Sequence, residues 1–200
     1  MKFLRTATYS EYVTWYLERE AWKTGGAYDV PRSIAAQHEL MIAEHSGKVR
    51  DWFIRGEWYL VEMDGGEELG NLIFLDDSQT RSEGLINGWG QLDYRIVSRV
   101  VSNALQSDYL LRHTENAVAR YYNAILEGKL RLEEQHRLVL CDPDASEQGT
   151  NPSARFYLHD GAARGLAYML ALSAASKEPV FRLEAFYCKN AGDLSAAGSP

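Results

Sequence analysis

The clearest pattern of apolar and polar positions lies between Arg155 and Ala175, where a short apolar run gives way to a helical repeat. Residues 156–158 are aromatic or apolar and precede Gly161, which is typical of a buried strand. The residues that follow are rich in alanine, and Leu166, Met169 and Leu170 recur at helical spacing. This pattern predicts a strand that turns within a few residues into a helix.

The rest of the chain alternates between the two kinds of pattern. We expect four further helices. The first starts at the capping residue Thr8, and the second runs from Pro31 to about His45. The third covers Gln91–Tyr109, and the fourth lies between a Thr114 cap and Gly128. We expect strands over residues 52–63, 71–75, 137–141 and 180–187. The first two of these strands have the spacing of a hairpin or of two neighbouring strands.

This order of elements favours an α+β fold with a small mixed sheet flanked by helices. Residues 1–50 are expected to form an N-terminal helical extension, residues 51–190 the α+β domain, and residues 191–200 a disordered tail. The chain has 200 residues, of which 46% are hydrophobic, and this is enough to build the core of one domain.

Charge and composition narrow the possible functions. The net charge of −7 argues against general binding to nucleic acids or anionic membranes, which depends on lysine and arginine. No apolar run has the length of a membrane span or a signal peptide. Cys141 and Cys188 have no metal-ligand spacing and are expected to be reduced thiols of a cytoplasmic protein, with a disulfide as the alternative. The 12% aromatic content leaves a homodimer or a protein partner open.

The predicted strand-to-helix junction is the main candidate for chemistry. A helix that starts directly after a strand has unpaired backbone N–H groups at its first turn, and such a turn suits an anion. Gly161 allows close approach of the backbone, and Arg164 adds a guanidinium group. Asp160 has the position of a helix cap, a metal partner or a general base. The alternative is that these residues only punctuate a strand–helix connection.

Three other places carry weaker signals. His38 and His45 lie seven residues apart, about 10.5 Å along a helix, which favours packing over a shared metal ion. The polar segment 76–90 has the length of a functional loop and contains Arg81, although a solvated loop explains it as well. Glu62 is an acidic residue near the end of an early strand.

The run from Asn123 to Tyr187 resembles the ParB/sulfiredoxin-like superfamily, in which a strand ends in a D-G-x-x-R or G-x-x-R signature followed by a helix. Asp160, Gly161 and Arg164 stand at the signature positions. The resemblance implies that the glycine and arginine hold nucleotide phosphates. Many members have a basic residue or cysteine before the arginine, whereas this chain has Ala162 and Ala163. Reduction of sulfinic acids, which needs a cysteine in that turn, is therefore not expected.

The resemblance implies a small bacterial cytoplasmic enzyme that binds a nucleotide or another phosphate ligand and acts on a small metabolite, as a phosphotransferase or hydrolase. ATP or another nucleotide with Mg²⁺ would be the cofactor. The alternatives are a non-catalytic module that senses a ligand or binds a protein, and a DNA-acting nuclease. The catalytic candidates are Asp160, His159 and Glu62, and the phosphate-binding candidates are Gly161, Ala162, Ala163, Arg164 and Arg81.

Overall fold

The computed structural model describes residues 1–25, 29–49, 52–63, 65–74, 96–129, 136–142, 156–174 and 183–189. In chain order the elements are β1 (Lys2–Ala7), α1 (Tyr9–Lys23), α2 (Ile34–His45), the short 3₁₀ helix η1 (Ser46–Lys48), β2 (Glu57–Met63), α3 (Glu67–Gly70), β3 (Ile73–Phe74), α5 (Val97–Gln106), α6 (Tyr109–Arg112), α7 (Ala117–Leu126), β4 (Leu138–Cys141), β5 (Tyr157–Asp160), α8 (Ala162–Ala174) and β6 (Leu183–Lys189). The predicted loop 76–90 and tail 191–200 lie outside the described residues.

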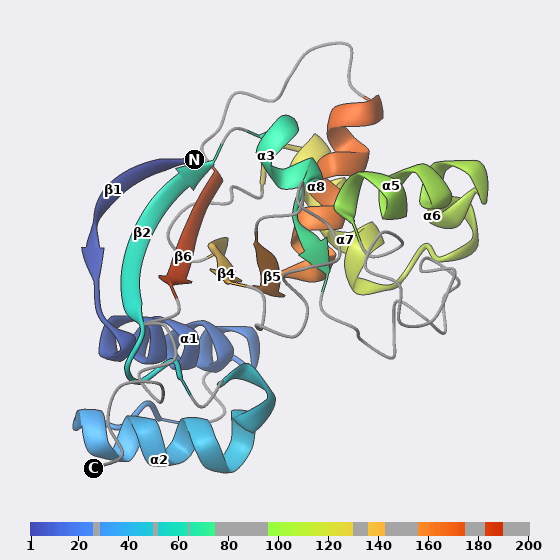
Figure 1. The fold of residues 1–200 in the computed structure, drawn as a ribbon. Coiled ribbons are helices and arrows are strands. Elements are labelled where there is room, and N and C mark those ends of the chain that lie inside the picture. Colours follow the sequence, from blue (N-terminus) through green and yellow to red (C-terminus); the bar gives the residue numbers. More distant parts are fainter. Residues whose placement is uncertain are drawn as a thin grey trace.

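The strands form one mixed six-stranded sheet in the order β1-β2-β6-β4-β5-β3 (Figure 1). Strand β6 lies inside the sheet, antiparallel to β2 and parallel to β4. The predicted α+β class with a mixed sheet is therefore confirmed. The prediction that residues 52–63 and 71–75 are neighbours was wrong, because β6, β4 and β5 lie between β2 and β3. Strand β3 reaches the far edge and pairs there in parallel with β5.

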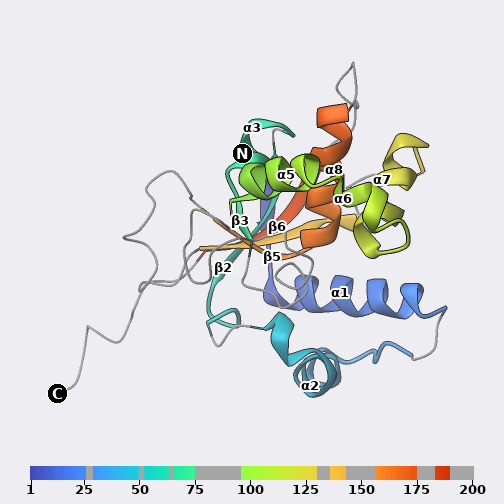
Figure 2. The same ribbon diagram turned by 90° about the vertical axis from the view of Figure 1, so that its right-hand side faces the viewer.

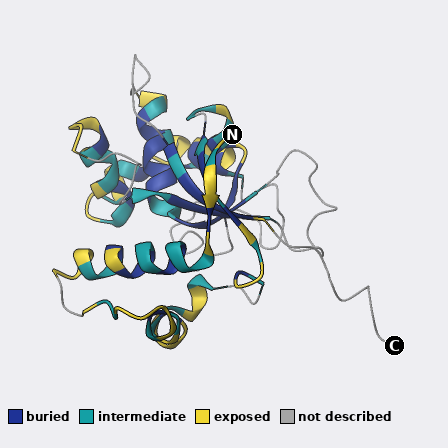
Figure 3. Cartoon of the chain, turned by 90° about the vertical axis from the view of Figure 1, so that its left-hand side faces the viewer, coloured by how far each residue is buried: buried dark blue, intermediate teal, exposed yellow. Residues whose placement is uncertain are grey.

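Helices cover both faces of the sheet. Figure 2 shows α1 and α2 on one side and α5, α7 and α8 on the other. Each side has its own apolar cluster, and Figure 3 shows the buried sheet residues between the two helical layers. The sheet is therefore the middle layer of three.

The first fifty residues share the sheet and the core of the later strands. Strand β1 pairs with β2, and Tyr12, Tyr16 and Leu17 of α1 belong to the same apolar cluster as Trp58 and Phe186. The ring of Tyr12 stacks on that of Trp58 with the centroids 4.7 Å apart. The segment predicted as a helical extension therefore also contributes strand β1 to the sheet, and α1 packs on the core beside the later strands.

The helix starts follow from their capping side chains. The Thr8 hydroxyl accepts a hydrogen bond from the backbone N–H of Glu11 at 3.1 Å, as predicted. The second helix begins at Ile34 rather than Pro31, because the Ser33 hydroxyl caps it.

Two further boundaries differ from the prediction. The helix expected over residues 91–109 ends at Gln106, and Asp108 takes a left-handed conformation with φ 51°. The next long helix is capped by Asn116 rather than Thr114, since the Asn116 side chain accepts the N–H of Ala119 at 2.9 Å. Asparagine and threonine are both good caps, so composition did not decide between them.

Cys141 and Cys188 are buried free thiols, as predicted, and they face each other in register on β4 and β6. In the described part of the chain, no helix combines the length and the hydropathy that crossing a bilayer requires.

Candidate functional site

The strand–helix junction forms where the sequence predicts it. Strand β5 ends at Asp160 and α8 begins at Ala162, with Gly161 between them at φ +97°. A Cβ atom on Gly161 would lie 2.6 Å from a methyl carbon of Leu138 and 2.9 Å from Nη2 of Arg164. Both the backbone angle and the lack of space therefore require glycine here.

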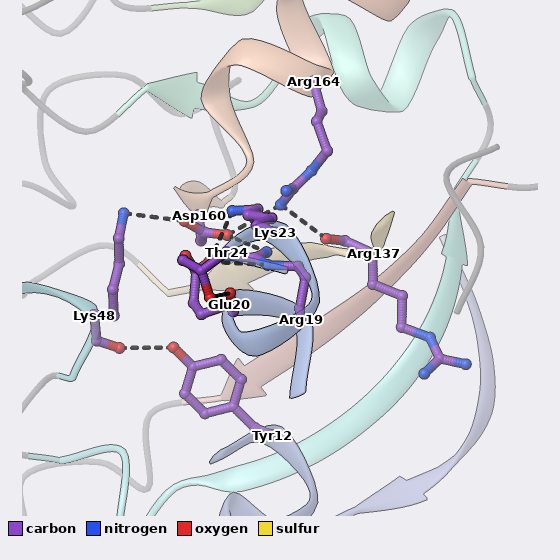
Figure 4. A network of polar contacts seen from close by, with 9 residues as sticks. All are labelled: Tyr12, Arg19, Glu20, Lys23, Thr24, Lys48, Arg137, Asp160 and Arg164. Carbon is purple, nitrogen blue, oxygen red and sulfur yellow. Dashed lines mark hydrogen bonds and ion pairs between the residues drawn. The ribbon is translucent and has the colours of Figure 1, made fainter. Parts of the chain in front are cut away.

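Three basic side chains converge on the carboxylate of Asp160 (Figure 4). Its Oδ2 lies 2.7 Å from Nη1 of Arg19 and 3.0 Å from Nη2 of Arg164, and its Oδ1 lies 3.0 Å from Nζ of Lys48. These partners come from α1, α8 and η1. One buried aspartate thus joins the end of β5 to three helical segments, two of them among the first fifty residues.

A second acidic residue extends this group on α1. The Glu20 carboxylate accepts from Arg19 at 2.8 Å and lies 2.7 Å from Nζ of Lys23. We call the six residues the Asp160 cluster: Arg19, Glu20, Lys23, Lys48, Asp160 and Arg164. It holds four basic and two acidic side chains, so its net charge is positive.

The two arginines of the cluster are fixed and almost fully buried, with side chains 2% and 3% exposed. The guanidinium of Arg19 lies over the rings of Trp15 and Tyr16, 4.8 and 4.7 Å from their centroids. Nη2 of Arg164 also donates to the backbone carbonyl of Arg137 at 3.1 Å. By contrast, Lys23 and Lys48 are 32% and 39% exposed and form the accessible part of the cluster.

The cluster holds Asp160 in its ionised form. Burial alone would raise the pKa of Asp160, but the charges of Arg19, Arg164 and Lys48 hold that pKa well below its usual value. Burial would likewise lower the pKa of Arg19, and Asp160 and Glu20 more than offset this effect. Asp160 is therefore a weak base, which does not suit the general base that the sequence suggested.

His136 responds to the positive charge of the cluster. Its pKa falls to about 4, first because the ring is partly buried and then because Arg164, Arg19 and Lys23 disfavour a further positive charge. Its ring lies edge-on to that of Trp22, with the centroids 5.7 Å apart. The potential beside the cluster is thus one that attracts anions.

Comparisons with known proteins find no match. This holds for protein-family models, for curated proteins and for solved structures. The function is therefore inferred from the geometry of the site, and membership of the ParB/sulfiredoxin-like superfamily stays a prediction.

The other two catalytic candidates differ in their position relative to the cluster. His159 is buried with its ring edge-on to Phe53, 4.8 Å between centroids, within the layer toward α1 and α2. Glu62 lies on β2 in register with Glu184 of β6. Two strands separate β2 from β5, which places Glu62 about 14 Å from β5 across the sheet. Glu62 therefore does not converge with Asp160, whereas His159 adjoins Asp160 on β5.

The phosphate-binding candidates have mixed outcomes. Ala162 and Ala163 form the partly exposed first turn of α8, directly after Gly161. Arg164 points back at Asp160 rather than outward. Arg81 lies outside the described residues.

Sequence reasoning missed Arg19, Lys23 and Lys48. Arg19 and Asp160 are separated by 141 residues in the sequence, so no local pattern predicts their contact. The only available signal was position: Arg19 follows Trp15 and Tyr16 at helical spacing, which puts it on the buried side of α1.

The cluster does not suit a protein-bound Mg²⁺ ion. The Asp160 carboxylate already faces three cations, which would repel a fourth. Within the described ranges, no three His, Cys, Asp or Glu side chains are placed to hold a metal ion. The two histidines of α2 pack instead on rings of α1, His38 on Tyr9 and His45 on Tyr16.

Proposed function

We propose that this chain binds a phosphate-bearing small molecule at the Asp160 cluster, and that a nucleotide is the first candidate. The observation that carries the proposal is the excess of basic over acidic side chains around the end of β5 and the start of α8. A helix start of this kind adds backbone N–H groups and a favourable dipole for an anion.

The four basic residues differ in exposure, and this sets the role that each would have in binding a ligand. A ligand would contact Lys23 and Lys48, which are partly exposed, and the first turn of α8. Arg19 and Arg164 are buried, so they would not contact the ligand and would attract it only through their positive charge. Nε of Arg164 has no hydrogen-bond partner among the described residues and lies 3.4 Å from the place that a Cβ of residue 161 would take. Because glycine has no side chain, the backbone of Gly161 lies close to this Nε donor of Arg164.

The arrangement supports binding better than catalysis by the predicted residues. Asp160 is held as a weak base, and Glu62 lies across the sheet from it. A non-catalytic, ligand-sensing role therefore becomes the preferred form of the proposal. Phosphotransferase or hydrolase activity is a second candidate, because the same cations would also stabilise charge on a phosphoryl group during transfer.

Thermal denaturation in the presence of ligands tests the proposal. The purified protein would be screened against phosphate, pyrophosphate, AMP, ADP and ATP, with and without Mg²⁺, at constant ionic strength set with chloride. A ligand at a hundred times its Kd stabilises a protein by about 2.7 kcal/mol, which gives a clear rise in Tm.

Two lysine variants make the test specific. We expect Lys48→Ala to weaken the rise in Tm, because it removes an accessible cation of the cluster. Lys189→Ala is the control, since Lys189 is 54% exposed and pairs with Glu57 on the β2–β6 pair of strands. No rise with any of the ligands, or equal losses in both variants, would rule out phosphate binding at this site.

A further inference from the structure

An exposed aromatic ring stands beside the Asp160 cluster. Trp22 is 59% exposed, although it belongs to a helix whose other large residues are mostly packed against the sheet. Exposure of so large an apolar ring costs free energy in water, and such rings are often used to bind partners or ligands.

Helix geometry places this ring next to the positive charge. Arg19, Trp22 and Lys23 occupy positions i, i+3 and i+4 of α1, which lie on one side of a helix. Arg19 contacts Asp160, and Lys23 contacts Glu20. Trp22 therefore lies about 4.5 Å farther along the axis of α1 than Arg19, the residue that contacts Asp160.

A second connection runs through the two residues that precede β4. The ring of His136 contacts that of Trp22, and the next residue, Arg137, accepts a hydrogen bond from Arg164 through its carbonyl. Trp22 and the cluster are thus linked in two ways, along α1 and through His136 and Arg137. The edge contact with His136 fixes the tryptophan on one side and leaves much of its surface in solvent.

We infer that Trp22 is a stacking platform for an aromatic ring carried by the phosphate ligand, so that the site selects a nucleotide over phosphate or a sugar phosphate. The inference rests on the proposed function, because the cluster must hold the phosphate. The base would stack on Trp22 while the phosphate lies at Lys23 and Lys48. Stacking of a base on an aromatic side chain tolerates different bases, since every base has a π-face.

Isothermal titration with AMP, ribose 5-phosphate and inorganic phosphate separates the two parts of the proposal. We expect wild-type protein to bind AMP at least about tenfold more tightly than ribose 5-phosphate, which lacks the ring. Trp22→Ala should lose about tenfold in affinity for AMP and keep its affinity for ribose 5-phosphate. Phe3→Ala is the matched control, because Phe3 is 55% exposed but lies on β1 and packs on Tyr59.

The outcomes distinguish the failure of each idea. If the wild type binds AMP and ribose 5-phosphate equally, or if Trp22→Ala weakens both equally, the stacking platform is wrong while phosphate binding stands. If the wild type binds none of the three ligands, both the platform and the phosphate site are refuted. Circular dichroism of Trp22→Ala would check that α1 is intact, as expected for an exposed side chain.

Discussion

Removing the charge of Asp160 is the most direct test of how the cluster is built. The substitution Asp160→Asn keeps the size of the side chain and one acceptor oxygen, but it takes away the negative charge that faces Arg19, Arg164 and Lys48. The two arginines would then remain buried with less compensation. We therefore expect the variant to be markedly less stable than the wild type.

The three partners contribute unequally to the expected loss. Lys48 is 39% exposed and can turn to solvent, so its share is at most about 1 kcal/mol. Arg19 and Arg164 are buried, and each keeps one other acceptor, Glu20 and the Arg137 carbonyl respectively. Breaking a buried ion pair typically costs about 3–5 kcal/mol, and the acceptor oxygen of asparagine favours the lower end, about 3 kcal/mol.

Urea denaturation at pH 7, followed by tryptophan fluorescence, measures this loss. A lower midpoint with an unchanged slope would assign the effect to stability rather than to a change in the unfolded state. The control is Glu57→Gln, which removes an acidic residue that pairs with Lys189 at 3.4 Å on the surface. That variant should leave the free energy of unfolding almost unchanged, because the pair is exposed to solvent.

The pH dependence gives an independent check on the same charge. The pKa of Asp160 is lower in the folded protein than in the unfolded chain, where it is near 3.8. Its ionic contribution is therefore fully present above that value and is lost as the pH falls toward the folded pKa. The gap between wild type and Asp160→Asn should be constant from pH 7 to about pH 5 and narrow below pH 4. A gap under 1 kcal/mol at pH 7, or one that widens in acid, would refute this account.

Two further predictions concern residues that border the cluster. Gly161→Ala should destabilise the protein by at least about 1–2 kcal/mol in urea denaturation, because φ is +97° and the new Cβ would meet Leu138. The control is Gly165→Ala, inside α8, which should destabilise the protein less. His136 has a folded pKa of about 4, below its unfolded value of 6.5, so the unfolded chain takes up a proton first and stability should fall as the pH drops from 6.5 toward 4. His136→Gln should remove this part of the acid sensitivity, and NMR titration of the His136 ring should show a midpoint well below 6. A midpoint near 6.5 would contradict the combined effect of burial and of the nearby positive charges.

Local signals were enough to predict the junction that carries the site. The apolar run before Asp160, the glycine after it and the alanine-rich repeat all lie within about twenty residues, so each reports on its own backbone. The Thr8 cap was predictable for the same reason, since its acceptor and donor are three residues apart.

The two distant partners of Asp160, Arg19 and Lys48, could not be predicted, because their contacts depend on the tertiary fold. Arg19 and Lys48 reach the Asp160 carboxylate only after α1 has packed on the sheet, on the face to which β5 and β6 contribute apolar residues. No short-range pattern specifies that β3 crosses to the far edge or that β6 enters the middle. The sequence therefore suggested an arginine that faces a ligand, whereas the folded chain uses it to neutralise its own aspartate.

The central position of β6 also determines when the protein is able to fold during its synthesis. Strand β6, the last described in the chain, joins the pair β1–β2 to the group β4, β5 and β3. Until residues 183–189 have left the ribosome, these two groups have no strand between them and each exposes an unpaired edge. Nascent chains shorter than this would be candidates for chaperone binding, and the whole sheet would close in one late step.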